Sequence, residues 1–446
     1  MLTKGVPSRM MEKVSRLHHL KVKEALDLGD VLRLLFQRDM LLLVAGSFMA
    51  LLNLFVAVTV LPLYVLHLGG TAADAGWQAG LFTFSAIALR SVVGPLADRY
   101  GRRRLLVLGS AAYGLAPLGL LLADSLGTVA VLRVFQALGS AAFLSAASAL
   151  ATDLSPRSLR ATGLGVLGVF KSLALGLAPP LGMAVADQLG FRTLFLLCTV
   201  VGAVGTACVV LVREPSARSG PAVSGASPAR RGDWASVLAQ APARLALASM
   251  AVVAVAYGAV MTFVPVYGQE LGLPHHGLYF PIMAAAAVVG SLVAGRLADS
   301  LGRVTVLLPV LALNAVGVAA AGALAAPGAF VVSALLVGQG FAGAFAVLGA
   351  LLAENVGDGQ RGLVFALQEN AIDTGMTLGA LAVGMAAGGA GYTAGFGGIG
   401  ALCLLWTAWL RIQRSRGLAW PRPGTREPEA RPGTAGQPEP FPPPGE

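Results

Sequence analysis

Twelve apolar runs constrain the fold of this chain most strongly, because each is near or above the roughly 20 residues that a helix needs to cross a bilayer. Of the 446 residues, 56% are hydrophobic and 12% are charged, whereas an ordinary soluble domain has roughly 25% charged residues. One water-soluble core of this size cannot bury that excess of apolar side chains. The runs are too long for membrane strands and lack two-residue alternation, so we predict an all-α integral membrane protein with twelve transmembrane helices. The runs lie at about 39–66, 77–97, 104–123, 128–152, 161–187, 191–212, 243–268, 278–298, 304–324, 328–354, 362–387 and 392–412.

A polar interval rich in Pro, Ser, Gly and Arg separates the sixth run from the seventh and divides the chain into two halves. The sequence therefore predicts two six-helix bundles joined by a linker. The end of the chain is rich in Pro, Gly and Glu, a composition that favours disorder. The predicted segments are a basic N-terminal segment at 1–38, a first bundle at 39–212, a cytoplasmic linker at 213–242, a second bundle at 243–412 and a disordered tail at 413–446. The first 38 residues carry eight basic residues and no sustained apolar core, so no cleavable signal peptide is predicted.

The positions of lysine and arginine predict the orientation. Twenty-eight of the 32 lie in the two terminal segments, the linker and every second loop, and one, Arg192, lies in the alternate loops. Basic loops remain on the cytoplasmic side of a membrane. We therefore expect both termini and the linker to be cytoplasmic, in a multi-pass protein of a bacterial inner membrane.

A charged turn recurs at half the chain length. GPLADRYGRRR, at 94–104, is followed 201 residues later by GRLADSLGR, at 295–303. LPLYVLHLG, from Leu61, similarly matches VPVYGQELG, from Val264. The chain is thus a duplication of two parallel six-helix repeats, an architecture of secondary transporters with a binding site near the bilayer midplane. The repeated positions are Gly94, Asp98, Gly101 and Arg102 in the first turn and Gly295, Asp299, Gly302 and Arg303 in the second.

These motifs resemble those of the major facilitator superfamily of transporters, over about 39 to 412. The family signature between helices 2 and 3, G-x-x-x-D-R-x-G-R-R, is matched at Gly94, Asp98, Arg99, Gly101, Arg102 and Arg103, and the second copy departs from it at Ser300. RVFQALGSA, from Arg133, resembles the fourth-helix motif R-x-x-Q-G-x-G, whose arginine is linked in the family to proton coupling. ALGLAPPLGM in helix 5 is a partial version of the antiporter motif that keeps Pro179 and Gly182, with Ala174, Ala178 and Met183 in place of glycines.

The charged turn is expected to act as a gate as well as a topology signal. Gly94 allows close helix packing, and Gly101 permits the reversal of the chain. Asp98 can accept hydrogen bonds from the N-terminus of a facing helix, a contact made only when the cytoplasmic side is closed. The simpler alternative is a loop that only holds positive charge inside, which we favour for Arg103 and Arg104.

Five charged residues lie well inside the apolar runs, at least five residues from either end, and a charge at a helix centre costs about 3 kcal/mol. Because helices 2 and 11 face each other in the family that the chain resembles, we expect Arg90 to pair with Glu369 or Asp373 across the two bundles. The pair would hold one state and break when an acid is protonated. The alternative is a local structural pair or a side chain that reaches the membrane surface. The candidates for proton coupling are Arg90, Arg133, Lys171, Glu369 and Asp373.

Four polar residues lie on helices 1, 4, 7 and 10, which line the central cavity of that family. They are candidate substrate contacts, although polar side chains that bond neighbouring helices are equally common. The other cavity residues would be apolar, which favours a hydrophobic or amphipathic substrate over a sugar. The four candidates are Asn53, Gln136, Tyr257 and Gln339.

The sequence thus predicts a secondary transporter that works by alternating access and exports a small molecule against protons, as a monomer in the lipid bilayer. The alternative within this class is a proton symporter that imports a small metabolite. A membrane enzyme or a sensor is a weaker alternative, because no catalytic cluster and no signalling domain is visible. No catalytic residue, cofactor, metal site or nucleic-acid partner is predicted. The three cysteines all lie in apolar runs and suggest no disulfide framework.

Overall fold

The computed structural model describes residues 34–156, 159–213, 237–273, 276–355 and 361–416, with only the backbone described for 91–92, 94–100, 145, 160–161, 327, 353–355, 361–363 and 365–366. All regular structure in these ranges is helical. The helices are α3 (Arg38–His67), α4 (Ala72–Tyr100), α5 (Arg102–Leu120), α6 (Leu126–Leu154), α7 (Arg160–Leu211), α9 (Ala241–Glu270), η2 (His276–Leu278), α10 (Tyr279–Leu301), α11 (Arg303–Ala321), α12 (Pro327–Asn355), α13 (Arg361–Ala387) and α14 (Gly391–Ser415).

The longest helix, α7, reverses its direction at Gly190, where the backbone is not helical (φ 82°, ψ 163°). Both of its arms pack on α3. Phe170 of the first arm contacts Phe48, and Phe191 at the reversal contacts Tyr64. The second arm then returns along α3, where Asn53 donates a hydrogen bond to the carbonyl of Cys198. With α7 counted as two arms, the described part of the chain contains the twelve long helices that the sequence predicts.

Eight of the described helices, with α7 counted once, are long and apolar enough to cross a membrane by length and composition. The three that fall short are α4, α5 and α13. Charged residues lower the hydropathy of two of these helices: Arg102 begins α5, and Glu369 and Asp373 lie in α13.

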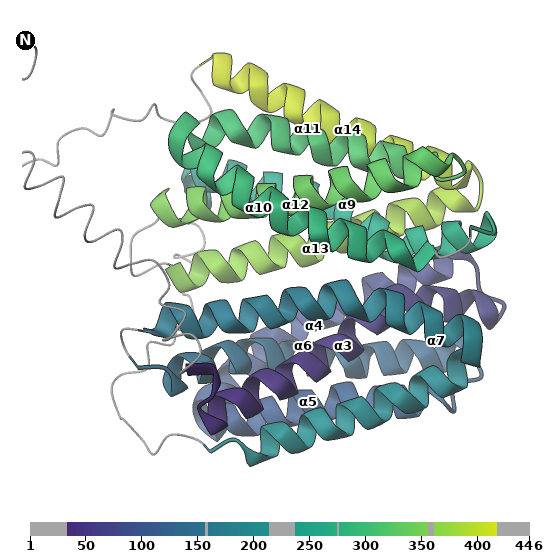
Figure 1. Cartoon of the computed structure of the whole chain (residues 1–446), viewed down its shortest axis with the longest axis vertical. Helices are drawn as coiled ribbons and strands as arrows, with labels where there is room; N and C mark the ends of the chain where they lie inside the picture. The colour runs from purple at the N-terminus through teal and green to yellow at the C-terminus, as the bar shows by residue number, and fades with distance from the viewer. Residues whose placement is uncertain (1–33, 157–158, 214–236, 274–275, 356–360, 417–446) are drawn as a thin grey trace, which may run out of the picture.

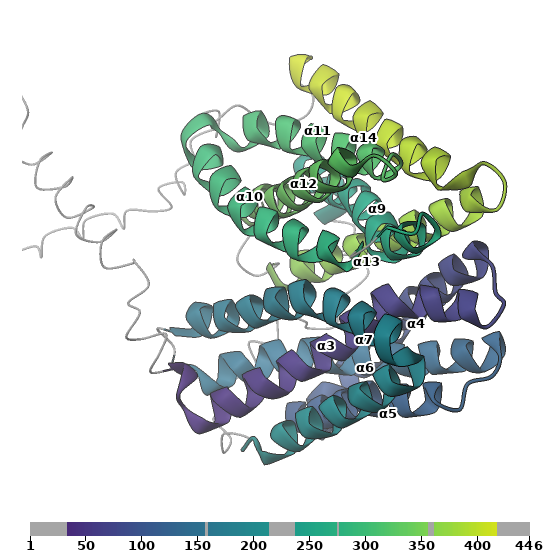
Figure 2. The ribbon, with the colours of Figure 1, turned by 45° about the vertical axis from the view of Figure 1, so that its right-hand side comes forward.

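The helices form two bundles, one of α3 to α7 and one of α9 to α14 (Figure 1). The same separation is visible after a turn of 45° (Figure 2), and α4 of the first bundle packs against α13 of the second. Buried side chains of both bundles, such as Val60 and Val260, belong to one continuous apolar cluster. The two bundles therefore meet along a common seam.

Three pairs of glycines show that the two bundles repeat the same backbone. Six glycines of the described residues have positive φ, a conformation that glycine adopts without strain. Two of the pairs are 201 residues apart and the third is 203 apart. They are Gly101 and Gly302 (φ 88° and 90°), Gly190 and Gly391 (both 82°), and Gly69 and Gly272 (81° and 61°). We call the end of the molecule with Gly101 and Gly302 the motif end, and the end with the other four the opposite end.

The bundles touch toward the opposite end. There a Cβ added to Gly384 of α13 would lie 2.7 Å from the carbonyl oxygen of Ala72, at the start of α4. A Cβ on Gly277, just before α10, would lie 3.4 Å from Cα of Pro180 in α7. Toward the motif end, a Cβ on Gly165 of α7 or on Gly295 of α10 would meet no atom within 4 Å. The two bundles are therefore close together at the opposite end. At Gly165 and Gly295, toward the motif end, neither α7 nor α10 is in contact with a neighbouring helix.

Two tyrosines make equivalent ties at the opposite end. The hydroxyl of Tyr64 donates to the carbonyl of Ala123 (2.7 Å), just beyond α5, and the hydroxyl of Tyr267 lies 3.3 Å from the carbonyl of Gly322, just beyond α11. A net hydrogen bond contributes about 1 kcal/mol, and more when its loss leaves a buried acceptor unpaired. We expect Tyr64→Phe to lower the melting temperature of the purified protein, and Tyr267→Phe to lower it less, because Tyr267 is only half-buried. Equal melting temperatures for Tyr64→Phe and the wild type would contradict this.

The helix bounds lie close to the predicted segments, with small extensions at their edges. Leu34, within the predicted N-terminal segment, is fully buried, and a helical turn at 237–239 lies within the predicted linker. Helix α14 continues to Ser415, three residues into the predicted tail. The rest of the N-terminal segment, the linker and the tail lie outside the described residues, so their predicted character remains a prediction.

Candidate transport site

Small residues bring α4 and α13 together at the seam between the bundles. A Cβ on Gly76 of α4 would lie 2.9 Å from the carbonyl oxygen of Ala380 and 3.4 Å from Cα of Leu381. One turn further along α4, a Cβ on Gly80 would make an ordinary contact of 3.5 Å with Thr377. The two backbones therefore approach most closely toward the opposite end.

An ion pair crosses the same seam nearer the middle of the helices. Nη1 of Arg90 lies 2.5 Å from Oδ2 of Asp373, and the two side chains are each 24% exposed. The same Nη1 donates a hydrogen bond to Oδ1 of Asn370 (3.3 Å). Of the two acids that the sequence offers as partners for Arg90, the structure selects Asp373.

Two further charged groups surround this pair. Glu369, one turn before Asp373 on α13, and Lys171 of α7 are both close enough to act electrostatically on Asp373. Glu369 is half-buried, and Lys171 is exposed. The first arm of α7, which carries Lys171, packs against the second bundle between one and two turns further along, where a Cβ on Gly176 would lie 3.1 Å from Cβ of Ala284 in α10. We call Arg90, Lys171, Glu369 and Asp373 the seam cluster.

Arg133, the fifth candidate, lies apart from this cluster within the first bundle. Its side chain is only 2% exposed. Nη1 donates to Oε1 of Gln136 (3.2 Å), and Cζ lies 5.1 Å from the centroid of the Phe82 ring. Nε has no hydrogen-bond partner among the described residues.

Asn53 and Gln136 come together at a small cavity inside the first bundle. The cavity has a volume of about 10 Å³ and is otherwise lined by apolar residues of α3, α5 and α7, together with Cys198. This space holds about one water molecule. Asn53 is occupied by structural bonds, since its Nδ2 donates to the carbonyls of Cys198 (2.9 Å) and Tyr113 (3.4 Å). The geometry thus favours Asn53 as a residue that bonds neighbouring helices over Asn53 as a substrate contact.

Tyr257 and Gln339 lie in the second bundle and do not join that cavity. The ring of Tyr257 is buried and stacks on Phe341 of α12, with 3.9 Å between the centroids. Gln339, two residues before Phe341, is half-buried, and its backbone packs against Gly290 of α10. The structure therefore distributes the four predicted substrate contacts over both bundles.

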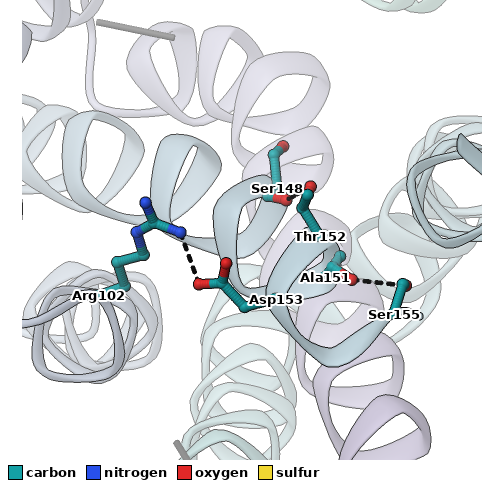
Figure 3. A network of polar contacts seen from close by, with 6 residues as sticks. All are labelled: Arg102, Ser148, Ala151, Thr152, Asp153 and Ser155. Carbon is teal, nitrogen blue, oxygen red and sulfur yellow. Dashed lines mark hydrogen bonds and ion pairs between the residues drawn. The ribbon is translucent and has the colours of Figure 1, made fainter. Parts of the chain in front are cut away.

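The charged turns lie at the motif end, and part of their geometry is described. Gly101 and Gly302 have positive φ, the backbone conformation that the chain reversal at each turn requires. Nη1 of Arg102, at the start of α5, lies 2.5 Å from Oδ2 of Asp153 in the last turn of α6 (Figure 3). Asp153 is exposed, so this ion pair contributes at most about 1 kcal/mol. The side chains of Asp98 and Arg99 and the surroundings of Gly94 lie outside the description. In the second turn, Asp299 is exposed and Arg303 is half-buried.

The residues of the partial helix-5 motif lie where α7 meets its neighbours. A Cβ on Gly182 would lie 3.1 Å from Val56 and Val60 of α3, and Pro179 is buried one turn earlier. The nearby His276 is also buried, with Nδ1 3.2 Å from the carbonyl oxygen of Leu273. His275 lies outside the described residues.

Two residues of this region were not predicted from the sequence. Asn370 shares Arg90 with Asp373, and Phe82 covers Arg133. A polar residue between two acids in an apolar run was a usable signal for Asn370. Phe82 carried no such signal, because one phenylalanine among many in a membrane helix is unremarkable in sequence.

Comparison with known proteins decides the family. The model of the Major Facilitator Superfamily matches residues 43–289 and 276–443. The chain belongs to the Major Facilitator Superfamily. Two solved members of this fold superpose on most of it. A bacterial homologue of the human lysosomal transporter Spinster, inward-facing and unoccupied, has a TM-score of 0.66 at 16% identity and covers 86% of this chain and 98% of its own. The nucleoside transporter NupG has a TM-score of 0.69 at 12% identity, and the superposition covers 85% of this chain and 99% of NupG.

Curated relatives align over shorter stretches of this chain. The inner membrane transport protein YajR of Escherichia coli is 27% identical over 242 residues, 53% of this chain and 52% of its own length. A chloramphenicol resistance protein of Pseudomonas aeruginosa is 31% identical over 156 residues, 35% of this chain and 37% of its own. The multidrug transporter AQR1 of Candida glabrata is 32% identical over 122 residues, which are 27% of this chain and 21% of its own length. The chain thus spans about half of YajR and less of the other two.

The all-α fold and the assignment to the transporter family are therefore confirmed, and the protein is a multi-pass membrane protein. Among the described residues, no group of three or more His, Cys, Asp or Glu side chains is placed to hold a metal ion.

Proposed function

We propose that this transporter exports a hydrophobic or amphipathic small molecule across a bacterial inner membrane in exchange for protons, with both termini cytoplasmic. The observation that carries the proposal is the Arg90–Asp373 ion pair, because it joins the two bundles that must move and contains an acid that can take up a proton. With the topology from lysine and arginine, the motif end faces the cytoplasm. The structure is then the inward-facing state.

The ion pair couples protonation to the choice of state. An ionised Asp373 attracts Arg90 and holds α4 against α13. A protonated Asp373 loses this attraction, and the states that separate these helices then become more populated. A ligand can shift such an equilibrium only by its different affinity for the two states, and here the proton is that ligand.

Export is supported by the relatives and the partial helix-5 motif. Two of the relatives have names that refer to drugs, a chloramphenicol resistance protein and a multidrug transporter. Gly182 and Pro179, retained from the antiporter motif, pack on α3 and beside the contact of α7 with the second bundle. The apolar lining around Gln136 suits an amphipathic compound.

The direction of coupling is testable in proteoliposomes that contain a pH-sensitive dye. With equal pH on both sides and a panel of drugs, including chloramphenicol, added outside, we expect substrate entry to make the lumen more alkaline, because protons leave in exchange. A lumen that becomes more acidic as substrate enters would show a symporter and overturn the proposal. Protein-free liposomes correct for passive entry.

A further inference from the structure

Arg133 is a buried cation without an anion. It is 2% exposed, and its described polar contact is the neutral Gln136. No described acidic side chain lies within ion-pair distance of it, whereas Arg90 and Arg102 each have an aspartate at 2.5 Å. An arginine remains protonated in proteins, so this site retains its positive charge.

The charges of the apolar runs balance except for Arg133. At least five residues from either end of these runs, the described chain has three cations and two anions. Arg90 pairs with Asp373, and Glu369 and Lys171 are both within electrostatic reach of that pair. The seam cluster thus contains two positive and two negative groups. The remaining positive charge is that of Arg133.

The surroundings of Arg133 substitute only weakly for a counter-ion. The Phe82 ring offers the guanidinium its π face at 5.1 Å, an interaction much weaker than pairing with a carboxylate in a dry site. Nε, which has no partner in the described structure, is a donor that a carboxylate oxygen would accept. Phe82 is half-buried on α4, so rotation of its side chain would uncover the guanidinium.

We infer that the cargo carries one negative charge, and that Arg133 is the residue that binds it. This inference rests on the proposed transport function and names its substrate class, an amphipathic monoanion such as an aryl or alkyl carboxylate. The carboxylate would bind the guanidinium, with Gln136 beside it. The apolar body would lie along the apolar residues near Gln136, where Val56, Val60 and Phe195 line the water-sized cavity of the present state.

The test uses three probes that share one apolar body and differ only in charge: 4-phenylbutyrate, 4-phenylbutyramide and 4-phenylbutylamine. Binding to the purified full-length protein in nanodiscs is measured by calorimetry at equal pH, without a gradient. We expect the carboxylate to bind at least about 10-fold more tightly than the amide or the amine, the range that a charge-assisted hydrogen bond supplies. Equal binding of the three probes, or binding of none of them, would overturn the inference.

Variants assign the preference to Arg133. We expect Arg133→Gln to abolish the preference for the carboxylate and Arg133→Lys to keep part of it, because lysine keeps the charge without the planar fork. Arg192→Gln, an exposed cation of the opposite end, is the matched control and should keep the preference in full. A preference that survives Arg133→Gln would exclude Arg133 as the anion site. Since binding needs no gradient, this result is independent of whether transport is coupled to protons.

Discussion

Replacing Asp373 by asparagine is expected to reduce proton-driven transport more than tenfold, whereas replacing Glu369 by glutamine should have a smaller effect. The two acids lie one turn apart on α13, but only Asp373 forms the 2.5 Å ion pair with Arg90. Breaking a buried pair costs about 3–5 kcal/mol, and this pair is a quarter exposed, so the lower end of that range applies. Initial rates in proteoliposomes at several values of pH measure the effect.

The double variant Arg90→Gln/Asp373→Asn separates coupling from stability. A lone Arg90 left by Asp373→Asn is an uncompensated charge, and removal of both charges eliminates this cost. We therefore expect the double variant to regain thermal stability relative to either single variant, while its transport no longer depends on pH in the same way. If Glu369→Gln were as damaging as Asp373→Asn, or if Arg90→Ala left transport and its pH dependence unchanged, the ion pair would not be the coupling element.

Gly76→Ala is expected to shift the protein out of the state described here, and Gly80→Ala is expected to leave it there. A Cβ on Gly76 would lie 2.9 Å from the backbone oxygen of Ala380, which no side-chain rotation can relieve, whereas one on Gly80 would make a normal contact. Overpacking of this kind costs about 1–3 kcal/mol, which corresponds to a 5- to 150-fold change in an equilibrium between states.

The two glycine variants are matched because both add one methyl group to the same face of α4. The gain in helix propensity from glycine to alanine is the same at both positions and cancels in the comparison. Since the clash lies between the bundles and not within one, Gly76→Ala should change the rate of transport while the protein still folds. Identical transport by Gly76→Ala and Gly80→Ala would show that the α4–α13 contact does not limit the motion.

The sequence predicted the fold because its signals are long and repeated. Membrane-length apolar runs and a charged turn that recurs at an offset of 201 predicted the helices and the duplication, and Gly101 and Gly302 have the backbone that the repeat implied. The break between the fifth and sixth runs implied the reversal near Gly190. The equivalence of Gly190 and Gly391 was not predicted, because a glycine between two apolar runs has no distinctive neighbours.

The site was less predictable because its residues come from distant parts of the chain. Charge in an apolar run identified Arg90 and Asp373, but the choice between Asp373 and Glu369 depends on how α13 is rotated against α4, which no local pattern specifies. The neighbours Asn370 and Phe82 depend on the same packing. Which of Asn53 and Gln136 is occupied by structural bonds also became apparent only from the carbonyls that approach them.

The central claim is that the two bundles rock about the seam and that the Arg90–Asp373 pair stabilises the state open at the motif end. Pairs of spin labels can measure this directly in a protein whose cysteines, Cys198, Cys208 and Cys403, are replaced by alanine. One pair, Leu164→Cys on α7 and Leu297→Cys on α10, reports the motif end. The other, Gln188→Cys on α7 and Gln269→Cys on α9, reports the opposite end. All four labelled positions are exposed.

The decisive measurement is the change in both distances when Asp373→Asn is introduced. We expect the motif-end distance to shorten and the opposite-end distance to lengthen, because loss of the pair favours the alternate state. In the protein with Asp373 intact, acidification should cause the same opposed changes as the carboxylate takes up a proton. Distances that remain unchanged, or that change in the same direction at both ends, would contradict the account.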